Sequence, residues 1–275
     1  MDASRQLLQR LEELPPLPRN TMRLGQLVED PTSTPLQLAR VIEQDASLAA
    51  RIMKLANSAY FAVSGGVDTL ERAVCLLGFS TIHQIALCLQ SMQILGNAGA
   101  APPESIVTHA LEVATASQLL AERLAKPMPQ RFFTAGLLHD IGRLALFVLE
   151  PEKGQQWQRT APESEQRLEL ERETFGIDHQ TAGNMLAGRW KYPEPLAVAI
   201  GNHHAPDCGC GHSDIVLVIS VADNWIRQLV QNGVPGTEWK PRADVAQAAG
   251  LPESPDEQFT TTFELRMAET STDWT

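Results

Sequence analysis

The sequence is short of aromatic residues and of positive charge. Aromatic residues make up 5% of its 275 residues, and 22 lysines and arginines face 33 aspartates and glutamates, for a net charge of −11 at pH 7. This acidic balance argues against broad electrostatic binding to nucleic acid or to an anionic membrane surface. The hydrophobic fraction of 43% is still enough for a substantial core, which excludes a chain that is disordered throughout.

Targeting segments and membrane spans are also missing from the sequence. Residues 1–15 lack the basic and apolar segments of a secretory signal, and no run reaches the ~18 uninterrupted apolar residues of a membrane-spanning helix. Only four cysteines are present: Cys75, Cys88, Cys208 and Cys210. We therefore expect a cytoplasmic protein with reduced thiols, and no membrane partner.

Two kinds of catalytic or metal-binding motif are absent or incomplete. There is no Gly-x-Ser-x-Gly motif and no Cys/His nucleophile arrangement. The segment Cys208-Gly209-Cys210-Gly211-His212 could form a small soft-metal site, but a second cysteine pair is missing. An exposed glycine-rich loop is the favoured interpretation of that segment. Cys75 and Cys88 lie on apolar faces of expected helices, which predicts that both are in the core.

Helix-forming residues and helical spacing dominate what is present. Apolar residues recur at three- and four-residue intervals, and few runs of β-branched residues occur, so the sequence predicts an all-α protein without a sheet. Thr34-Pro35 followed by Gln37 has the pattern of a helix start. The expected helices cover residues 21–29, 34–43, 45–56, 70–77, 80–95, 105–124, 132–149, 163–175, 178–190, 195–204 and 215–230, with Asp214 as the cap of the last.

Composition also suggests how the chain is divided. The Gly-, Ala- and Pro-rich segment 96–103 is the best candidate boundary between two helical lobes. We expect an N-terminal lobe over residues 1–98, a second lobe over 99–245 and an acidic, peripheral tail over 246–275. The last 25 residues hold six acidic residues and one basic residue, which is −5 of the total charge.

Ionisable side chains interrupt three of the apolar helices. They are His109, the adjacent pair His139-Asp140 and Asp223. Burying a carboxylate without a partner costs several kcal/mol (~3 or more), so each aspartate needs a hydrogen bond, an ion pair or a cation. Imidazole and carboxylate together suit Mn, Fe, Co, Ni or Zn. Each residue taken singly is more often a satisfied core residue or a helix cap, and both interpretations stay open at this point.

The order His109, His139-Asp140, Asp223 resembles the H…HD…D signature of the HD superfamily of metal-dependent phosphohydrolases. Further segments resemble the HDOD domain, the HD-related output domain of bacterial signalling proteins. These segments are Leu14-Pro15-Pro16-Leu17-Pro18, Val41-Ile42-Glu43-Gln44-Asp45-Ala46-Ser47-Leu48, Leu55-Ala56-Asn57-Ser58-Ala59-Tyr60 and Ala73-Val74-Cys75-Leu76-Leu77-Gly78. The resemblance covers residues 14 to 229.

The resemblance implies an HD-like helical bundle with an additional N-terminal helical lobe. It also implies a metal site, because this chain keeps the complete H…HD…D set. His179, His203 and His204 resemble the additional ligands of two-metal HD proteins, with Asp140 as the bridging carboxylate. One or two divalent ions (Fe, Mn, Ni, Co or Zn) are then expected, with Asp140 and Arg143 as catalytic residues.

Two departures from the two-metal proteins limit what the resemblance implies. No Gly-Tyr-Pro motif follows His203-His204, so hydrolysis of cyclic di-GMP is not expected. Among the two-metal HD proteins are the HD-GYP phosphodiesterases of cyclic dinucleotides, which carry a lysine at the position of Arg143. Arg143 could clamp a phosphate or lie on the helix surface.

Two functions follow from the resemblance. The first is hydrolysis of a phosphomonoester, a nucleotide or a cyclic nucleotide. The second is a catalytically inactive signalling module that acts through a protein partner.

Overall fold

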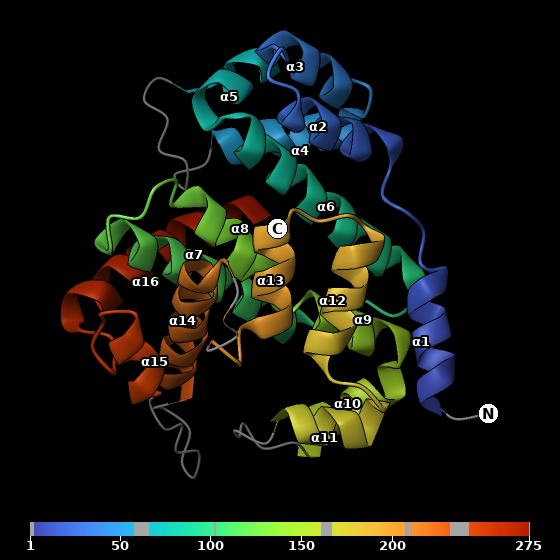
Figure 1. The fold of residues 1–275 in the computed structure, drawn as a ribbon, viewed down its shortest axis with the longest axis vertical. Coiled ribbons are helices and arrows are strands. Elements are labelled where there is room, and N and C mark those ends of the chain that lie inside the picture. Colours follow the sequence, from blue (N-terminus) through green and yellow to red (C-terminus); the bar gives the residue numbers. More distant parts are fainter. Residues whose placement is uncertain are drawn as a thin grey trace. The chain divides into compact units, whose positions relative to one another are not determined.

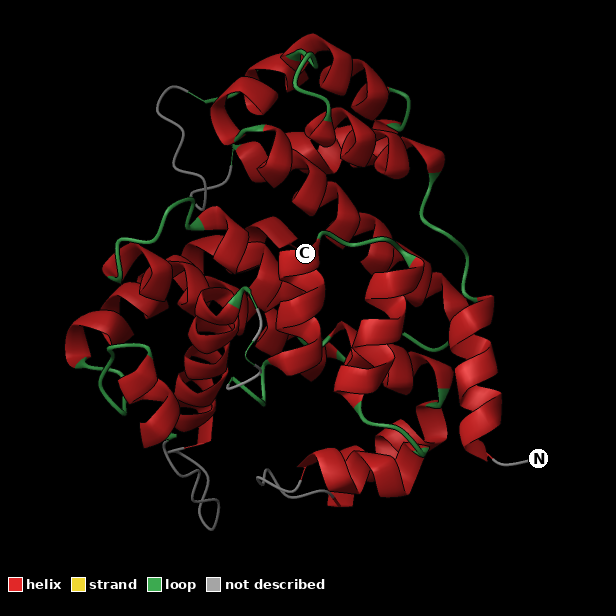
Figure 2. Ribbon diagram, in the orientation of Figure 1, coloured by secondary structure: helices red, strands yellow, loops and turns green. Residues whose placement is uncertain are grey.

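The structure is a computed structural model that describes residues 3–57, 66–101, 103–160, 167–206, 209, 211–231 and 242–274. Helices, turns and loops account for all of these residues, and no strand occurs among them (Figures 1 and 2). The predicted all-α fold is confirmed.

The chain divides into two compact units. Unit 1 comprises Met1–Pro15 and Ile94–Phe259, and unit 2 comprises Pro16–Gln93 and Thr260–Thr275. Helix α6 (Phe79–Ala98) and helix α16 (Glu257–Trp274) each contribute residues to both units. The bounds 1–98, 99–245 and 246–275 expected from composition remain a prediction about domains.

Unit 2 is built on four short helices and the first part of α6. They are α2 (Arg19–Glu29), α3 (Pro35–Glu43), α4 (Ala46–Ala56) and α5 (Leu70–Leu77). Thr34 and Gln37 form the predicted capping box at the start of α3, and Asp45 caps α4 by accepting from Leu48 N. These caps satisfy backbone N–H groups that a helix start leaves unpaired.

The apolar faces of these helices meet in a single core. Its fully buried members include Leu24, Leu38, Ile42, Ile52 and Ile82. Within this core, helices α2 and α6 approach closely. A Cβ atom added to Gly25 of α2 would lie only 3.1 Å from the ring of His83 on α6.

Unit 1 contains the helices that carry the candidate ligands. They are α1 (Ala3–Glu13), α7 (Glu104–Arg123), α8 (Gln130–Leu138), α9 (Ile141–Leu149), α10 (Pro151–Thr160), α11 (Arg167–Phe175), α12 (His179–Arg189), α13 (Glu194–Asn202), α14 (Ser213–Gln231) and α15 (Ala243–Ala248). Helix α7 packs on α8 and α14, α9 packs on α10 and α12, and α13 contacts α8, α12 and α14. The bundle therefore brings α7, α8, α9, α12, α13 and α14 together around one centre (Figure 1).

The single helix expected over residues 132–149 is wrong. The segment forms two helices, α8 and α9, which are separated at His139-Asp140. Asp140 leaves the helical region, with φ −99° and ψ 19°, and acts as the N-cap of α9. Adjacent side chains on a straight helix point about 100° apart, so the break changes the directions in which the two polar side chains of the pair leave the backbone.

Glycines on either side of this break allow close helix packing. A Cβ at Gly136 would lie 2.8 Å from Ala114 Cα of α7, and a Cβ at Gly142 would overlap the carbonyl oxygen of His179 on α12. The motif Gly136-Leu137-Leu138-His139-Asp140-Ile141-Gly142 thus lets the backbone of α8 and α9 approach the two helices that present His109 and His179.

One helical segment of the described residues is long and apolar enough to cross a membrane. It is Gln130–Leu149, and it is completely buried inside the protein, as expected of a core helix. Helices α5 and α6 pass the same test only as a pair, and they meet at a 112° bend.

Other local expectations also need correction. Helix α6 begins at Phe79 and reaches Ala98, beyond the expected end at residue 95. Helix α14 begins at Ser213, so that Asp214 lies in its first turn. The acidic C-terminal segment contains the 18-residue helix α16. Its Phe259 packs edge-on against Trp225 of α14 at 4.8 Å between ring centroids. Cys88 is buried as expected, but Cys75 is exposed.

Candidate metal centre

The seven predicted ligands come from five places in unit 1. His109 lies in the second turn of α7, and Asp223 lies in α14. His139 and Asp140 occupy the break between α8 and α9, and His179 is the first residue of α12, where the side chain of Asp178 caps the helix. His203 caps the C-terminus of α13, and His204 follows it. Residues distant in the sequence therefore converge on one centre.

The first group of candidate ligands comprises His109, His139 and Asp140. One donor atom of each lies within 4.8 Å of the others. Asp223 joins this group, since its Oδ1 lies 2.9 Å from His109 Nε2 and 4.0 Å from His139 Nε2.

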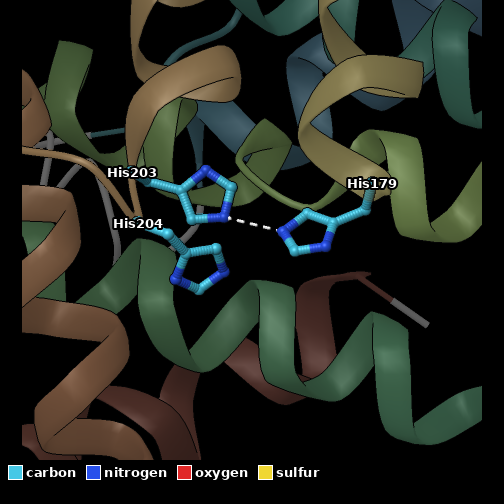
Figure 3. A group of neighbouring side chains, drawn as sticks. All are labelled: His179, His203 and His204. Carbon is cyan, nitrogen blue, oxygen red and sulfur yellow. Dashed lines mark hydrogen bonds between the residues drawn. The ribbon is translucent and has the colours of Figure 1, made fainter. Parts of the chain in front are cut away.

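The second group comprises His179, His203 and His204, again with donor atoms within 4.8 Å of one another. The rings of His203 and His204 lie side by side at the end of α13, with their centroids 4.3 Å apart, and His179 faces them from α12 (Figure 3). The Nε2 atoms of His179 and His203 are 3.1 Å apart.

Asp140 belongs to the first group and also lies beside the second. Its Oδ2 is 3.5 Å from His139 Nε2 and 4.0 Å from His109 Nε2. Its Oδ1 is 3.3 Å from His179 Nε2 and 3.6 Å from His203 Nε2. One carboxylate thus presents one oxygen to each group, which is the placement that a bridging carboxylate requires.

Hydrogen bonds to the outer nitrogens fix the orientation of three imidazoles. His139 Nδ1 donates to Gly136 O at 2.6 Å, and His203 Nδ1 donates to Ile200 O at 3.0 Å. His179 Nδ1 lies 2.5 Å from the Glu171 carboxylate. Because these oxygens only accept, each Nδ1 carries the proton and each Nε2 presents a lone pair to the centre.

The inward-facing atoms lack ordinary partners. His139 Nε2, His204 Nε2 and Asp140 Oδ1 are buried atoms without a hydrogen-bond partner in the described part of the chain. Because the Nδ1 protons of His179 and His203 are donated to Glu171 and to Ile200 O, the Nε2 lone pairs of the two rings face one another. A cation would bind the atoms that lack hydrogen-bond partners and would remove the repulsion between the facing lone pairs. The donor set therefore fits a metal.

Burial determines the protonation state of four of the candidate ligand histidines. It lowers the pKa of His139 to about 3 and lowers the pKa of His109 and of His179. It also holds the pKa of His204 well below its usual range. These rings are therefore neutral near pH 7, which is the form that binds metal ions.

Two buried arginines pair with the two aspartates. Arg143 Nη1 contacts Asp140 Oδ2 closely, and Arg227 Nε lies 2.9 Å from Asp223 Oδ1. Burial alone would raise the pKa of both aspartates, but the guanidinium groups and neighbouring imidazoles outweigh it, so the pKa of each lies well below the usual range. Arg143 is 4% exposed, so its placement on the helix surface is excluded.

Two functional neighbours were missed in the sequence. Glu171 of α11 is fully buried, and it accepts from His179 N at 2.8 Å and from Arg143 Nε at 3.1 Å. It lies in a charged segment where no spacing distinguishes it from its exposed neighbours. The pairing of Arg227 with Asp223 could have been predicted, because Arg227 lies four residues after Asp223 in an apolar helix. Cys208 and Cys210 lie outside the described residues.

Comparison with known proteins identifies the family. The HDOD domain family matches residues 14–206, and the chain belongs to this family. Asp223 and α14 lie beyond the matched range. A protein from Treponema pallidum (strain Nichols), named only "Uncharacterized protein", is 23% identical over 229 residues, covering 80% of this chain and 43% of its own length. The chain spans less than half the length of the curated relatives it matches.

Solved structures have the same fold. A "Putative phosphohydrolase" from Shewanella amazonensis SB2B is 25% identical with a TM-score of 0.70, covering 97% of this chain and 96% of that one. A "Putative signal transduction protein" from Marinobacter aquaeolei VT8 is 24% identical with a TM-score of 0.71, covering 98% of this chain and 65% of that one.

Proposed function

We propose that this protein is a cytoplasmic, metal-dependent phosphohydrolase of HD type. His109, His139, Asp140 and Asp223 would hold one divalent ion, and His179, His203 and His204 would hold a second, with Asp140 shared between them. The observation that carries the proposal is the pair of three-ligand groups, of which the first contains Asp140 and the second lies beside the other oxygen of the same carboxylate. The names of the structural relatives add support.

The residues of the chain have distinct tasks in such a site. Gly136 O, Ile200 O and Glu171 hold the Nδ1 protons of three histidines, so that the Nε2 atoms stay free for an ion. Arg143 binds Asp140 and Glu171 and fixes both carboxylates. A divalent ion would supply Lewis-acid polarisation of a phosphoryl oxygen and would acidify a water molecule.

The experiment is a metal-dependent hydrolysis assay. Protein prepared with Mn²⁺ or Fe²⁺ should hydrolyse a generic phosphomonoester such as p-nitrophenyl phosphate. Asp140→Asn should abolish turnover and reduce metal content, while Asp244→Asn, which changes an exposed aspartate, should leave both unchanged. Turnover that persists in Asp140→Asn refutes the proposal.

A second candidate function is an inactive signalling module. The observation in its favour is that Arg143 and Arg227 already supply positive charge to Asp140 and Asp223. Such pairing can balance two buried carboxylates without a metal. The name of the Marinobacter relative agrees with this reading.

The two candidates differ in what depends on Asp140. A signalling module retains capture of its protein partner in Asp140→Asn and loses it when unit 2 is altered. A phosphohydrolase loses its turnover in Asp140→Asn.

A further inference from the structure

A cavity of about 680 Å³ opens beside the first ligand group. His109, Asp140 and Arg143 line one side of it, whereas His179, His203 and His204 do not line it. Cavities of roughly 300–1,000 Å³ are typical of small-molecule and cofactor sites. A ligand in this cavity would therefore reach the His109 side of the centre.

Apolar and aromatic side chains also line the cavity. They are those of Ile106, Phe147, Trp157, Ile226 and Val230. Trp157 of α10 packs edge-on against Phe147 at 5.7 Å between centroids, and the guanidinium of Arg167 lies 5.4 Å from the Trp157 ring. None of these residues belongs to the candidate ligand set.

Buried arginines also line the cavity. Arg143, Arg167 and Arg227 all line it, and each is 5% exposed or less. Of the acidic lining residues, Glu104 is exposed at the start of α7, and burial raises the pKa of Glu112. Asp140 is paired with Arg143. Guanidinium groups bind phosphate through paired N–H donors.

Two of the lining residues carry N–H groups that their hydrogen bonds within the described part of the chain do not use. Trp157 Nε1 is buried without a hydrogen-bond partner among the described residues. Arg143 donates one N–H to Asp140 and one to Glu171, and its Nη2 lies 3.1 Å from His179 Nδ1, so its guanidinium keeps further N–H groups for a ligand. Buried donors of this kind favour an acceptor-bearing ligand.

We infer that this cavity binds a phosphate ester carrying a planar aromatic group, the chemistry of a nucleotide. Arg167 contacts the phosphate, and Trp157 binds the aromatic group. The inference rests on the proposed phosphohydrolase function for the reaction at the neighbouring centre. It assigns binding and specificity to α10 and α11, which provide none of the candidate metal ligands.

Calorimetric titration of the protein with three probes tests the inference. The probes are AMP, glycerol 3-phosphate and adenosine, each added to Mn²⁺-loaded and to EDTA-treated protein. AMP should bind more tightly than either of the others. Arg167→Gln should weaken AMP and glycerol 3-phosphate about tenfold or more and spare adenosine. Trp157→Phe should weaken AMP and adenosine and spare glycerol 3-phosphate.

Controls separate binding from folding. Arg123→Gln removes an arginine of α7 that pairs with Asp256 outside the cavity, and it should leave AMP affinity unchanged. Circular dichroism checks each variant, and Arg167→Lys, which keeps the charge but loses the paired donors, replaces Arg167→Gln if the latter does not fold. No AMP binding to the wild-type protein, or unchanged AMP affinity in both cavity variants, overturns the inference.

The outcomes also distinguish the inference from the proposed function. Metal-dependent turnover of p-nitrophenyl phosphate without AMP binding would retain the hydrolase and reject the nucleotide cavity. AMP binding that depends on Arg167 and Trp157, in a protein without metal or turnover, would retain the cavity and reject the hydrolase.

Discussion

Replacement of Glu171 by glutamine probes how the surrounding hydrogen bonds support the candidate metal centre. Glu171 accepts from His179 N at 2.8 Å, contacts His179 Nδ1 at 2.5 Å and pairs with Arg143 Nε at 3.1 Å. Burial alone would raise the pKa of its carboxyl group. The His179 and Arg143 side chains outweigh burial and bring the pKa to about 2 from the usual 4.5.

The magnitude follows from this difference in pKa. A folded-state pKa below the unfolded value means that ionised Glu171 stabilises the fold above pH 4.5, and that this stability is lost as the pH falls toward 2. A shift from 4.5 to about 2 corresponds to about 3 kcal/mol at pH 7. Glu171→Gln should therefore lower the free energy of unfolding by about 3 kcal/mol at pH 7 and by about 2 kcal/mol near pH 3.5.

Metal affinity gives the second measurement. Outer partners of ligating histidines typically contribute about 10–100-fold in affinity, so Glu171→Gln should weaken metal binding by that factor. Urea unfolding followed by circular dichroism and competition with a chromogenic chelator provide the two readouts. The matched control is Glu169→Gln, an exposed position of the same helix. A Glu171→Gln variant as stable as this control, with unchanged metal affinity, refutes the reasoning.

Three further predictions concern the surrounding fold. Gly142→Ala forces a Cβ onto the backbone of α12 and should cost about 1–3 kcal/mol of stability in urea unfolding; an unchanged midpoint contradicts this packing. Burial lowers the pKa of His83 to about 4 from 6.5, so stability should fall by about 2 kcal/mol between pH 7 and pH 4.5 as the folded state resists protonation. His83→Gln should remove that pH dependence, and parallel pH profiles would contradict it. Iodoacetamide should modify exposed Cys75 and spare Cys88, whose pKa burial raises to about 12; peptide mapping that finds Cys88 alkylated in the folded protein contradicts its burial.

Much of the fold could be predicted because it depends on local signals. The start of α3 follows from the Thr34 capping box and the end of α5 from Gly78, whose φ of +81° favours glycine. The break between α8 and α9 could not be predicted from hydropathy, because most residues of both helices are apolar. It depends on tertiary contacts that Gly136 and Gly142 permit.

The candidate centre was predictable only in part for a similar reason. Polar residues inside apolar helices, such as His109 and Asp223, stand out in the sequence because their burial is costly. Glu171 lies in a charged helix, and its burial depends on how α11 packs. The neighbouring sequence therefore does not indicate that Glu171 is buried. Trp157 and Arg167 likewise become neighbours only through the packing of α10 and α11.

Elemental analysis of the protein purified without chelator tests the central claim most directly. The proposed site predicts about one to two equivalents of a transition metal per chain, with loss of most of it in Asp140→Asn. Less than about one tenth of an equivalent, with no uptake after incubation with Mn²⁺ or Fe²⁺, would contradict the account.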